Sequence, residues 1–422
     1  MNILFCAAEC APIAKVGGLG DVVGSLPKAL LALGADARVL LPRYKNIGSE
    51  YLGDKVGELP VAFGGAQYRV GVFQTVLPAS AAVLYLLDEP GFFGSGGVYE
   101  QAGAAPGGEG EIAKFLFYNR CAAAFLQAGI WRPDVLHIHD WHAAYLAWLV
   151  KDLNIGAPTL LTIHNLAMQG MASAAALQAA GAAGASPAAN LLQIGIENAG
   201  RVNTVSPSYA REILTPEFGE GLDGVLRQRG DVLGILNGID EAVWNESSDP
   251  YITNHYGKFS AGLKLQNKTV LQKQMGLAVD PEMPLAGIVS RLTSQKGLDL
   301  LMPIAESIDA LPVQLAVVGV GEPEMERFFA EWARRRPEKI AFLPRFDERL
   351  AHEIYAAGDL FLMPSRFEPC GLGQMIAMHY GSIPIVRAVG GLKDSVIALN
   401  ADGSNMGAAT GFHIVRDDAQ EL

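Results

Sequence analysis

Residues 1–42 read "MNILFCAAECAPIAKVGGLGDVVGSLPKALLALGADARVLLP", and this stretch decides the fold. The opening "MNILFCAAE" is a short apolar run of the kind that a fully buried strand uses. In "DVVGSLPKALLALGA" (21–35) the apolar residues recur at helical spacing, and "DARVLLP" (36–42) predicts a second strand. A strand, a helix and a strand in this order predict a parallel sheet with a right-handed crossover.

The same alternation continues along the chain in two series that join near residue 237. A length of 422 residues is also typical of two domains rather than one. We therefore expect an α/β protein with two Rossmann-like domains, 1–236 and 237–422, facing a central cleft. Further strands are predicted at 81–88, 134–140, 158–165, 201–207, 285–292, 313–321, 339–346, 359–365 and 383–391, and helices at 111–128, 143–152, 297–308, 323–336, 349–358 and 371–381.

Composition and charge exclude several classes of function. The net charge of −12 argues against a nucleic-acid or anionic-membrane surface, which would need clustered Lys and Arg. The sequence has no uncharged apolar run of about 18 residues, so we expect no membrane span. Its four cysteines form no C-x-x-C pair and follow no secretory segment, which predicts a reducing, cytoplasmic compartment.

Two segments depart from the alternation. Residues 171–190 contain 11 alanines, interrupted by two glycines and a proline, and we interpret them as a loosely ordered excursion over the cleft. Residues 101–110, "QAGAAPGGEG", have the composition of a flexible loop.

The turn "KVGGLGD" (15–21) separates the first predicted strand from its helix. Its glycines let the backbone approach a ligand, the helix start favours anions, and Lys15 adds a positive charge. The spacing matches neither of the standard dinucleotide and P-loop patterns. An ordinary strand-to-helix turn with an exposed lysine is the alternative interpretation.

Polar groups also follow two later strands of the first series. In "HIHDWH" (137–142), three histidines and an aspartate suggest a metal site, but zinc would prefer a tighter set of ligands. A sugar site fits better, because Asp140 can accept from hydroxyl groups and Trp141 offers an apolar face. Core histidines with Asp140 capping a helix are the alternative. "TIHN" places His164 and Asn165 after the next strand.

In the second series, "SRLTSQKGLDLL" (290–301) and "PSRFEPCGLGQ" (364–374) follow predicted strands. Arg291 and Lys296 could grip both phosphates of a diphosphate, or they could be solvated surface charges. Glu368 precedes a helix start that could bind the same anion, which is unfavourable unless the carboxylate has another partner such as a sugar hydroxyl. A simple acid at a helix N-terminus is the alternative.

Taken together, these motifs resemble those of bacterial glycogen synthases and plant-type starch synthases, retaining glucosyltransferases of the GT-B fold that use ADP-glucose. The resemblance runs from Met1 to the last residues. It includes "TVSPSYAREI", "GILNGID" and "VRAVGGLKDSV" besides the stretches above, and Val16 is typical of the K-V-G-G branch.

The resemblance implies a reaction and a set of site residues. Glucose would pass from ADP-glucose to the non-reducing 4-hydroxyl of an α-1,4-glucan, with retention and without a cofactor or metal. The implied catalytic residues are Arg291, Lys296, Glu368, His164 and Asp140, and the implied donor-binding residues are Lys15, Gly17, Gly18, Asp21, Asn165, Cys370, Gly371 and Leu372.

The sequence also departs from the family pattern. Met168 replaces an aromatic residue, Gln193 stands where the family has a lysine, and Glu322 with Pro323 replaces the usual acid of a glycine-rich motif. The family continues for roughly 50–60 residues beyond "GFHIVRDDAQEL", so we expect a C-terminal domain that is cut short, and with it a protein of weak activity and low solubility. The alternatives are a transferase that uses UDP-glucose and a catalytically weak or truncated homologue that binds glucan or nucleotide. A plastid location is less favoured than the bacterial cytoplasm.

Overall fold

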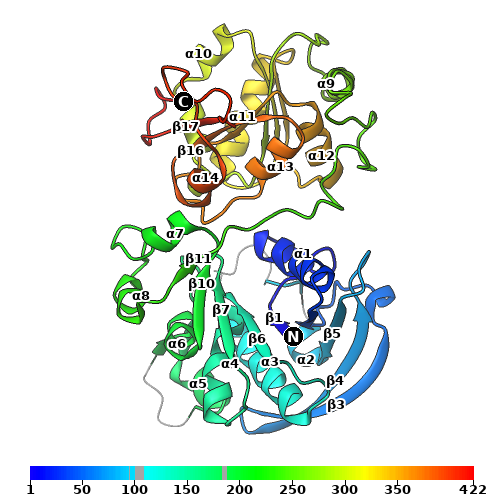
Figure 1. Cartoon of the computed structure of the whole chain (residues 1–422), viewed down its shortest axis with the longest axis vertical. Coiled ribbons are helices and arrows are strands. Elements are labelled where there is room, and N and C mark those ends of the chain that lie inside the picture. The colour runs from blue at the N-terminus through cyan, green and yellow to red at the C-terminus, as the bar shows by residue number, and fades with distance from the viewer. Residues whose placement is uncertain (95, 100–108, 183–187) are drawn as a thin grey trace. The chain divides into compact units, whose positions relative to one another are not determined.

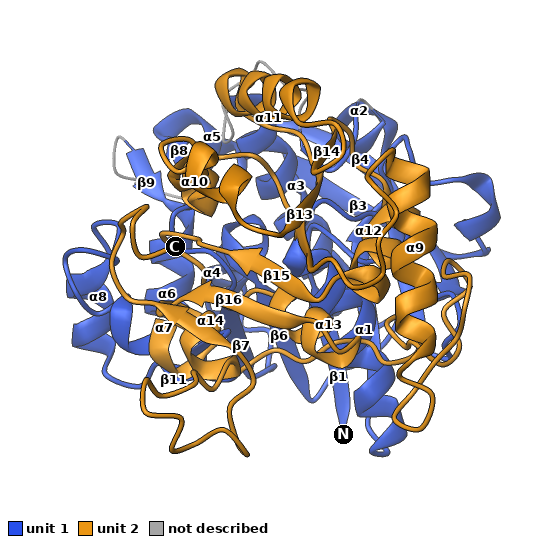
Figure 2. Cartoon of the chain, turned by 90° about the horizontal axis from the view of Figure 1, so that it is seen from above, with its two compact units in different colours: residues 1–205, 210–235 blue, residues 206–209, 236–422 orange. Residues whose placement is uncertain are grey.

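The computed structural model describes residues 1–94, 96–99, 109–182 and 188–422. These residues form two compact units, distinguished by colour in Figure 2. The first comprises Met1–Val205 and Ala210–Ile235, and the second comprises Ser206–Tyr209 and Leu236–Leu422. The division predicted between residues 236 and 237 did not anticipate the short piece Ser206–Tyr209.

Hydrogen bonds fix that short piece within the second unit. Ser206 Oγ donates to the carbonyl of Pro369 at 2.6 Å. The backbone N–H and the hydroxyl of Ser208 both donate to the carboxylate of Asp394, at 2.6 and 2.7 Å. The second unit is therefore built from two separate stretches of the chain.

The first unit contains a nine-stranded sheet (Figure 1) in the order β11-β10-β7-β6-β1-β2-β5-β4-β3. The strand β1 lies between β2 and β6 and pairs with both in parallel, so the order of the strands reverses at β1. The strands are β1 (Asn2–Cys6), β2 (Asp36–Pro42), β3 (Asp54–Phe63), β4 (Ala66–Val76), β5 (Val83–Asp88), β6 (Val135–His139), β7 (Thr159–Ile163), β10 (Arg201–Thr204) and β11 (Leu233–Gly234).

The hairpin of β3 and β4 was not predicted. Both of its pairings, β3 with β4 and β4 with β5, are antiparallel, unlike the rest of this sheet. In β3 the buried residues Leu59, Val61 and Phe63 alternate with exposed neighbours. Such alternation is typical of a strand with one solvated face, whereas the predicted strands were continuous apolar runs.

The three helices predicted in the first unit are present as α1, α3 and α4, and α1 and α4 each begin three residues earlier than expected, whereas α2, α6, α7 and α8 were not predicted. The helices α3, α4 and α6 pack side by side, and α4 is buried along most of its length. The helices are α1 (Gly18–Ala32), α2 (Pro90–Phe93), α3 (Glu109–Ala128), α4 (Asp140–Asp152), α5 (Ala174–Ala179), α6 (Leu191–Asn198), α7 (Pro207–Glu212, which spans the division at Tyr209) and α8 (Asp223–Arg229), with a 3₁₀ turn η1 (Ser49–Tyr51).

The described residues of the alanine-rich segment, 171–182 and 188–190, are more ordered than expected, which corrects the interpretation for these residues. Its described residues form β8 (Met171–Ser173), α5 and β9 (Ala188–Asn190), and the two strands pair antiparallel. The Ser173 hydroxyl accepts from the amide of Ala176 and so caps α5. Alanine has the highest helix propensity, which explains why a capped run of it folds. Residues 183–187, and 101–108 of the predicted flexible loop, lie outside the described residues.

The second unit contains a six-stranded, fully parallel sheet in the order β14-β13-β12-β15-β16-β17. The chain runs from β12 through β13 to β14 on one side, and then returns to place β15 on the other side of β12. The strands are β12 (Leu285–Val289), β13 (Gln314–Val318), β14 (Ile340–Leu343), β15 (Leu360–Met363), β16 (Ile383–Arg387) and β17 (Phe412–Ile414).

Both faces of this sheet are covered, which explains its continuous apolar strands. In β13, Leu315 and Val317 pack with Trp332 of α11 in one buried cluster. Ala316 and Val318 alternate with them and pack with Ile354 of α12 in another. The helices are α9 (Leu263–Met275), α10 (Ala305–Ala310), α11 (Pro323–Arg335), α12 (Glu348–Ala357), α13 (Gly373–His379) and α14 (Gly390–Ser395).

The single helix predicted at 297–308 is wrong. The structure has the 3₁₀ turns η2 (Ser294–Lys296) and η3 (Leu298–Leu301) there, followed by α10. Gly297 adopts a left-handed conformation, with φ of 66°, and a Cβ at this position would lie 2.1 Å from the carbonyl oxygen of Pro364. Pro303 lacks an amide hydrogen and disfavours a continuous helix through this point.

Candidate functional site

Two candidate residues meet where the strand order of the second unit reverses. Lys296 lies on the loop after β12, Glu368 lies on the loop after β15, and these strands are neighbours in the sheet. The Lys296 ammonium lies 2.5 Å from a carboxylate oxygen of Glu368. Open α/β sheets bind ligands at such a reversal, beyond the carboxyl ends of the strands.

The sequence did not predict this ion pair. Glu368 was expected to need a partner such as a sugar hydroxyl, and here its partners are Lys296 and the hydroxyl of Ser365, which donates at 3.1 Å. Glu368 is 7% exposed, so its charge requires such compensation. The pair gives the site one carboxylate and one ammonium in direct contact.

The loop after β15 is held by several backbone contacts. The amide of Gly391 donates to the carbonyl of Glu368 at 3.1 Å. Gly371 has a φ of 75°, and Gln374 donates to the carbonyls of Cys370 and Gly371. Leu372 is the N-cap residue of α13. These contacts fix the path of the chain on which Glu368 lies.

Cys370 is a buried thiol, and its burial raises its pKa to about 12. A thiol is nucleophilic only when it is ionised, so Cys370 does not supply a thiolate at neutral pH. The other three cysteines are also free and buried.

Glu322 also holds the loop that carries the two candidate cations. One of its carboxylate oxygens accepts from the amide of Ser294 at 2.8 Å. Arg291 is exposed and donates a long hydrogen bond, 3.5 Å, to the side chain of Gln295. The departure from the family pattern at Glu322 thus supplies a contact that fixes this loop.

In the first unit, the candidate residues follow β1, where that strand order reverses. Glu9 is 3% exposed, and one of its carboxylate oxygens accepts from the amides of Val16 and Gly17, both at 2.7 Å. Its other oxygen accepts from the hydroxyl of Tyr99 at 2.6 Å. The sequence analysis missed Glu9 and Tyr99, since only the fold shows that Glu9 holds the turn beside Lys15.

Lys15 and Asp21 form an ion pair of 2.7 Å. The side chain of Lys15 is 34% exposed and that of Asp21 is 25% exposed, so both reach the surface of the turn. Apart from the adjoining residues and the nearby backbone of α1, no described atom lies within 4 Å of a Cβ built on Gly17 or Gly18. The space beside these glycines is therefore open, as close approach of a ligand would require.

Asp140 organises the adjacent edge of the sheet. It lies after β6 with a φ of 52°, a conformation that is uncommon for a residue other than glycine. One of its carboxylate oxygens accepts from the amide of His164 at 2.6 Å and of Asn165 at 3.4 Å. Burial, opposed by these two hydrogen bonds, raises the pKa of Asp140 to about 7.

Four histidines lie buried around Asp140. The ring centroids of His137 and His139 lie 4.2 Å apart, so the two rings share one face of their strand, and His139 Nδ1 lies 2.9 Å from His164 Nε2. Desolvation lowers the pKa of His137, His142 and His164 to about 3 and that of His139 well below its usual value. These rings are therefore neutral at pH 7. Within the described residues, no group of three or more His, Cys, Asp or Glu side chains is arranged to hold a metal ion.

Trp141 does not offer the apolar face that was expected for a sugar. It is 1% exposed and packs edge-on against Phe115, with ring centroids 5.3 Å apart. A Cβ on Gly170 would lie 2.2 Å from the indole, so the turn after β7 also covers it. The indole belongs to the core.

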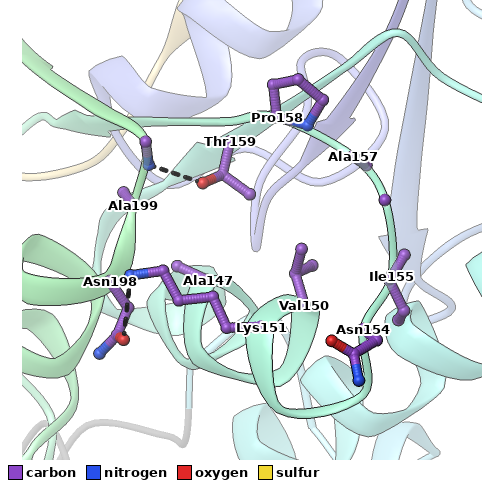
Figure 3. Close-up of a pocket in the computed structure, with 12 residues that line it drawn as sticks. Ala147, Val150, Lys151, Asn154, Ile155, Ala157, Pro158, Thr159, Asn198 and Ala199 are labelled. Atoms are coloured by element: carbon purple, nitrogen blue, oxygen red, sulfur yellow. Dashed lines mark hydrogen bonds between the residues drawn. The ribbon is translucent and has the colours of Figure 1, made fainter.

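A separate surface hollow of about 520 Å³ lies at the amino end of β7 (Figure 3). Lys151 reaches across it towards Asn198, and the amide of Gly200 donates to the Thr159 hydroxyl at 2.8 Å. His164 and Asn165 follow the carboxyl end of the same strand. The hollow is therefore at the opposite edge of the sheet and is not part of the candidate site.

None of the described helices is long and apolar enough to cross a membrane. The family described as "Starch synthase catalytic domain" matches residues 2–228, and the family described as "Glycosyl transferases group 1" matches residues 273–422.

The chain is similar along its whole length to curated and solved relatives. It is 42% identical to glycogen synthase 1 of Methylococcus capsulatus (98% of this chain, 85% of the relative) and 43% identical to glycogen synthase of Gloeobacter violaceus (95% and 85%). The solved catalytic domain of starch synthase IV from Arabidopsis thaliana, bound to ADP and acarbose, superposes with a TM-score of 0.91 at 34% identity, covering 100% of this chain and 89% of that one. Sucrose-phosphate synthase of Thermosynechococcus elongatus, at 17% identity, covers 100% of this chain and 87% of that one with a TM-score of 0.61, which indicates a shared fold alone.

Proposed function

The chain belongs to the family of bacterial glycogen synthases and plant starch synthases, which have the GT-B fold, and on that premise we propose that it transfers glucose from ADP-glucose to the non-reducing 4-hydroxyl of an α-1,4-glucan, with retention. The protein is thus a glucosyltransferase whose substrates are a nucleotide-sugar and a glucan.

The contact between Lys296 and Glu368 is the observation that carries the proposal. A glucosyl transfer from a nucleotide-sugar needs a cation at the departing diphosphate and an acceptor of hydrogen bonds at the sugar. The two loops place an ammonium and a carboxylate side by side at the reversal of the strand order. A diphosphate bound at Lys296 would thereby have its glucose beside Glu368.

In the proposed reaction, the bond between C1 of glucose and the diphosphate breaks, and ADP departs with the electron pair. The acceptor 4-hydroxyl forms a bond to C1 on the same face, and its proton passes to an oxygen of the departing diphosphate. Lys296 and Arg291 stabilise the negative charge that develops on the diphosphate, and this stabilisation increases as the bond breaks. Glu368 binds the transferring glucose.

On the first unit, we assign Asp140, His164 and Asn165 to the sugar, and Lys15, Gly17, Gly18 and Asp21 to the donor. Neutral histidines can donate from one ring nitrogen and accept at the other, which suits neutral hydroxyl groups. Lys15 lies in a turn with open space beside its glycines. We assign Cys370, Gly371 and Leu372 to backbone contacts with the donor.

We further propose that the reaction needs no metal ion, because Arg291 and Lys296 already supply positive charge for the departing diphosphate. An initial-rate assay with and without EDTA tests this proposal. The expected result is an unchanged rate, and loss of the rate in EDTA with recovery by Mg²⁺ would contradict it.

The decisive experiment is transfer of radiolabelled glucose to glycogen from ADP-glucose and, in parallel, from UDP-glucose at equal concentration. We expect ADP-glucose to be the preferred donor. Preference for UDP-glucose would establish the alternative donor, and binding of ADP without transfer would establish a homologue that only binds. The presence of Lys15, Arg291, Lys296 and Glu368 favours turnover over binding alone.

A further inference from the structure

The loops that carry Lys296 and Glu368 are joined by a second set of contacts, which involves neither of these side chains. The guanidinium of Arg366 donates to both carboxylate oxygens of Asp299, at 2.7 and 2.8 Å. It also donates to the carbonyl of Ser294 at 2.9 Å. Arg366 precedes Glu368 by two residues, and Ser294 and Asp299 flank Lys296. One side chain therefore spans both loops.

Backbone contacts reinforce this connection. The amide of Arg366 donates to the carbonyl of Gln295 at 2.9 Å. In return, the side chain of Gln295 donates to the carbonyl of Phe367 at 3.1 Å. The neighbours of Lys296 and Glu368 are thus bonded to each other directly.

The pair of Arg366 and Asp299 lies at the surface rather than in the core. The side chains are 32% and 35% exposed. Nε of Arg366 also donates to Asp417 at 2.7 Å, and Asp417 contacts Arg387 at 3.2 Å. Exposed ion pairs contribute little to global stability, although a bidentate arginine–carboxylate pair fixes geometry well. Such a pair is suited to holding two loops in register.

The need for such a connection follows from the proposed function, on which this inference rests. A bound diphosphate and Glu368 are both anionic and compete for the ammonium of Lys296. When Lys296 turns to the diphosphate, its 2.5 Å contact with Glu368 weakens and no longer joins the loops. The contacts of Arg366 are independent of the donor and remain.

We propose that Arg366 and Asp299 are positioning residues that keep the Lys296 loop and the Glu368 loop in register while Lys296 passes from Glu368 to the diphosphate of the donor. They act through Lys296 and Glu368, because the charges of Arg366 and Asp299 are directed at each other. Misplacement of a catalytic group by about 1 Å can reduce a rate on the order of 100-fold.

The test compares Arg366→Ala, Arg366→Lys and Asp299→Asn with the unmodified chain. For Arg366→Ala we expect kcat with ADP-glucose to fall roughly 10- to 100-fold while the melting temperature changes by less than about 2 °C. Arg366→Lys keeps the charge but loses the two-pronged contact, so it should recover part of kcat. The control is Arg336→Ala, which breaks the ion pair between the 55% exposed Arg336 and the 6% exposed Asp309 on the same unit and should leave kcat unchanged.

The double variant Lys296→Ala/Arg366→Ala separates positioning from a general structural effect. If Arg366 acts by holding Lys296 against Glu368, its loss should matter less once Lys296 is absent, so the double variant should lose less rate than the product of the two single losses. Losses that multiply, or an Arg366→Ala variant with full kcat, would overturn the proposal.

Hydrogen exchange of residues 290–297 and 364–373 gives a readout that does not depend on turnover. Arg366→Ala should accelerate exchange in both segments and Arg336→Ala in neither. Unchanged exchange in both segments contradicts the positioning role. An unmodified chain that does not transfer glucose contradicts the proposed function instead, and the exchange result still decides the role of Arg366.

Discussion

At the scale of single residues, both lysines that the sequence assigned to a diphosphate are already paired with carboxylates, Lys15 with Asp21 and Lys296 with Glu368. The residue types could be predicted from their motifs. The partner of Lys296 could not, since it lies 72 residues along the chain and only the adjacency of β12 and β15 brings the two together. For Trp141 the prediction itself was wrong. The residue was expected to present an apolar face to a sugar, but it is buried in the core.

Replacing Lys296 by alanine removes a contact that should strengthen as the diphosphate departs. We expect the activation free energy to rise by about 2–4 kcal/mol, which lowers kcat, while KM changes less. Steady-state kinetics with ADP-glucose measures both. The change also leaves Glu368 buried without its cation and should lower the melting temperature. Lys296→Ala/Glu368→Gln, which lacks both charges, should recover the melting temperature but not kcat, and a KM effect alone would show that Lys296 only binds the donor.

Replacing Glu368 by glutamine keeps the shape of the side chain and removes its charge. Because the carboxylate would no longer compete for Lys296, we expect ADP to bind at least as tightly as it does to the unmodified chain. Glucose transfer should nevertheless fall on the order of 100-fold or more. Calorimetric titration with ADP and the glycogen assay report these two effects separately, and a parallel loss of ADP affinity would point to a structural role.

At the scale of helices and strands, most parallel strands and the six helices α1, α3, α4, α11, α12 and α13 could be predicted because their apolar runs and helical spacing are local signals. The hairpin β3–β4 was not predicted because its buried residues, Leu59, Val61 and Phe63, alternate with exposed ones, whereas the predicted strands were recognised as continuous apolar runs. The helix expected at 297–308 is broken because Gly297 must approach the carbonyl of Pro364, a contact between distant segments. The residues around Gly297 contain no local signal for this contact, so the break in the helix could not be predicted from them.

The start of α1 allows a test of the open space beside the glycine turn. Gly18→Ala should leave stability unchanged or slightly higher, because alanine favours the first turn of a helix. It should raise KM for ADP-glucose, because the added methyl group would occupy space meant for the donor. Gly24→Ala is the contrasting variant, as its Cβ would lie 2.4 Å from the carbonyl oxygen of Ala11 and should destabilise the fold. If a stable Gly18→Ala protein had an unchanged KM for ADP-glucose, the proposal that the donor binds beside this turn would be wrong.

At the scale of the whole molecule, the two units differ in how they bury ionisable groups. The first contains the four buried, neutral histidines and the protonatable Asp140. The sequence showed the cluster of histidines but not its desolvation, because burial depends on α3, α4 and β7 together. The two sheets followed from the two series of strands, whereas the contribution of Ser206–Tyr209 to the second unit did not.

The cluster predicts that the first unit is sensitive to acid. Unfolded histidines bind protons below a pKa of about 6.5, while the folded rings stay neutral to about pH 3, so protons are taken up on unfolding. Asp140 has the opposite sign, since its raised pKa holds one proton in the folded state between about pH 4 and 7. Near pH 5 the unfolded chain therefore binds about three more protons here, and stability should fall by about 4 kcal/mol per pH unit as the pH drops.

Hydrogen exchange at pH 7.5, 6.5 and 5.5 tests this expectation, with the amides of each unit followed separately. The first unit should lose protection well before the second. His142→Phe removes one titrating ring, so urea unfolding monitored in the first unit should show a pH slope that is smaller by about 1.4 kcal/mol per unit. Equal acid sensitivity of the two units would show that the buried histidines do not control it.

The short piece Ser206–Tyr209 has a consequence for dividing the gene. The backbone passes from one unit to the other three times, after Val205, after Tyr209 and after Ile235. A fragment that starts at Leu236 would lack Ser206 and Ser208, and would leave the carbonyl of Pro369 and the carboxylate of Asp394 without these donors. Pro369 follows Glu368 directly, so loss of these hydrogen bonds would disturb the loop that carries the proposed glucose-binding carboxylate. We therefore expect separately expressed halves of the chain to reassemble into the native fold only when residues 206–209 are supplied together with the second half.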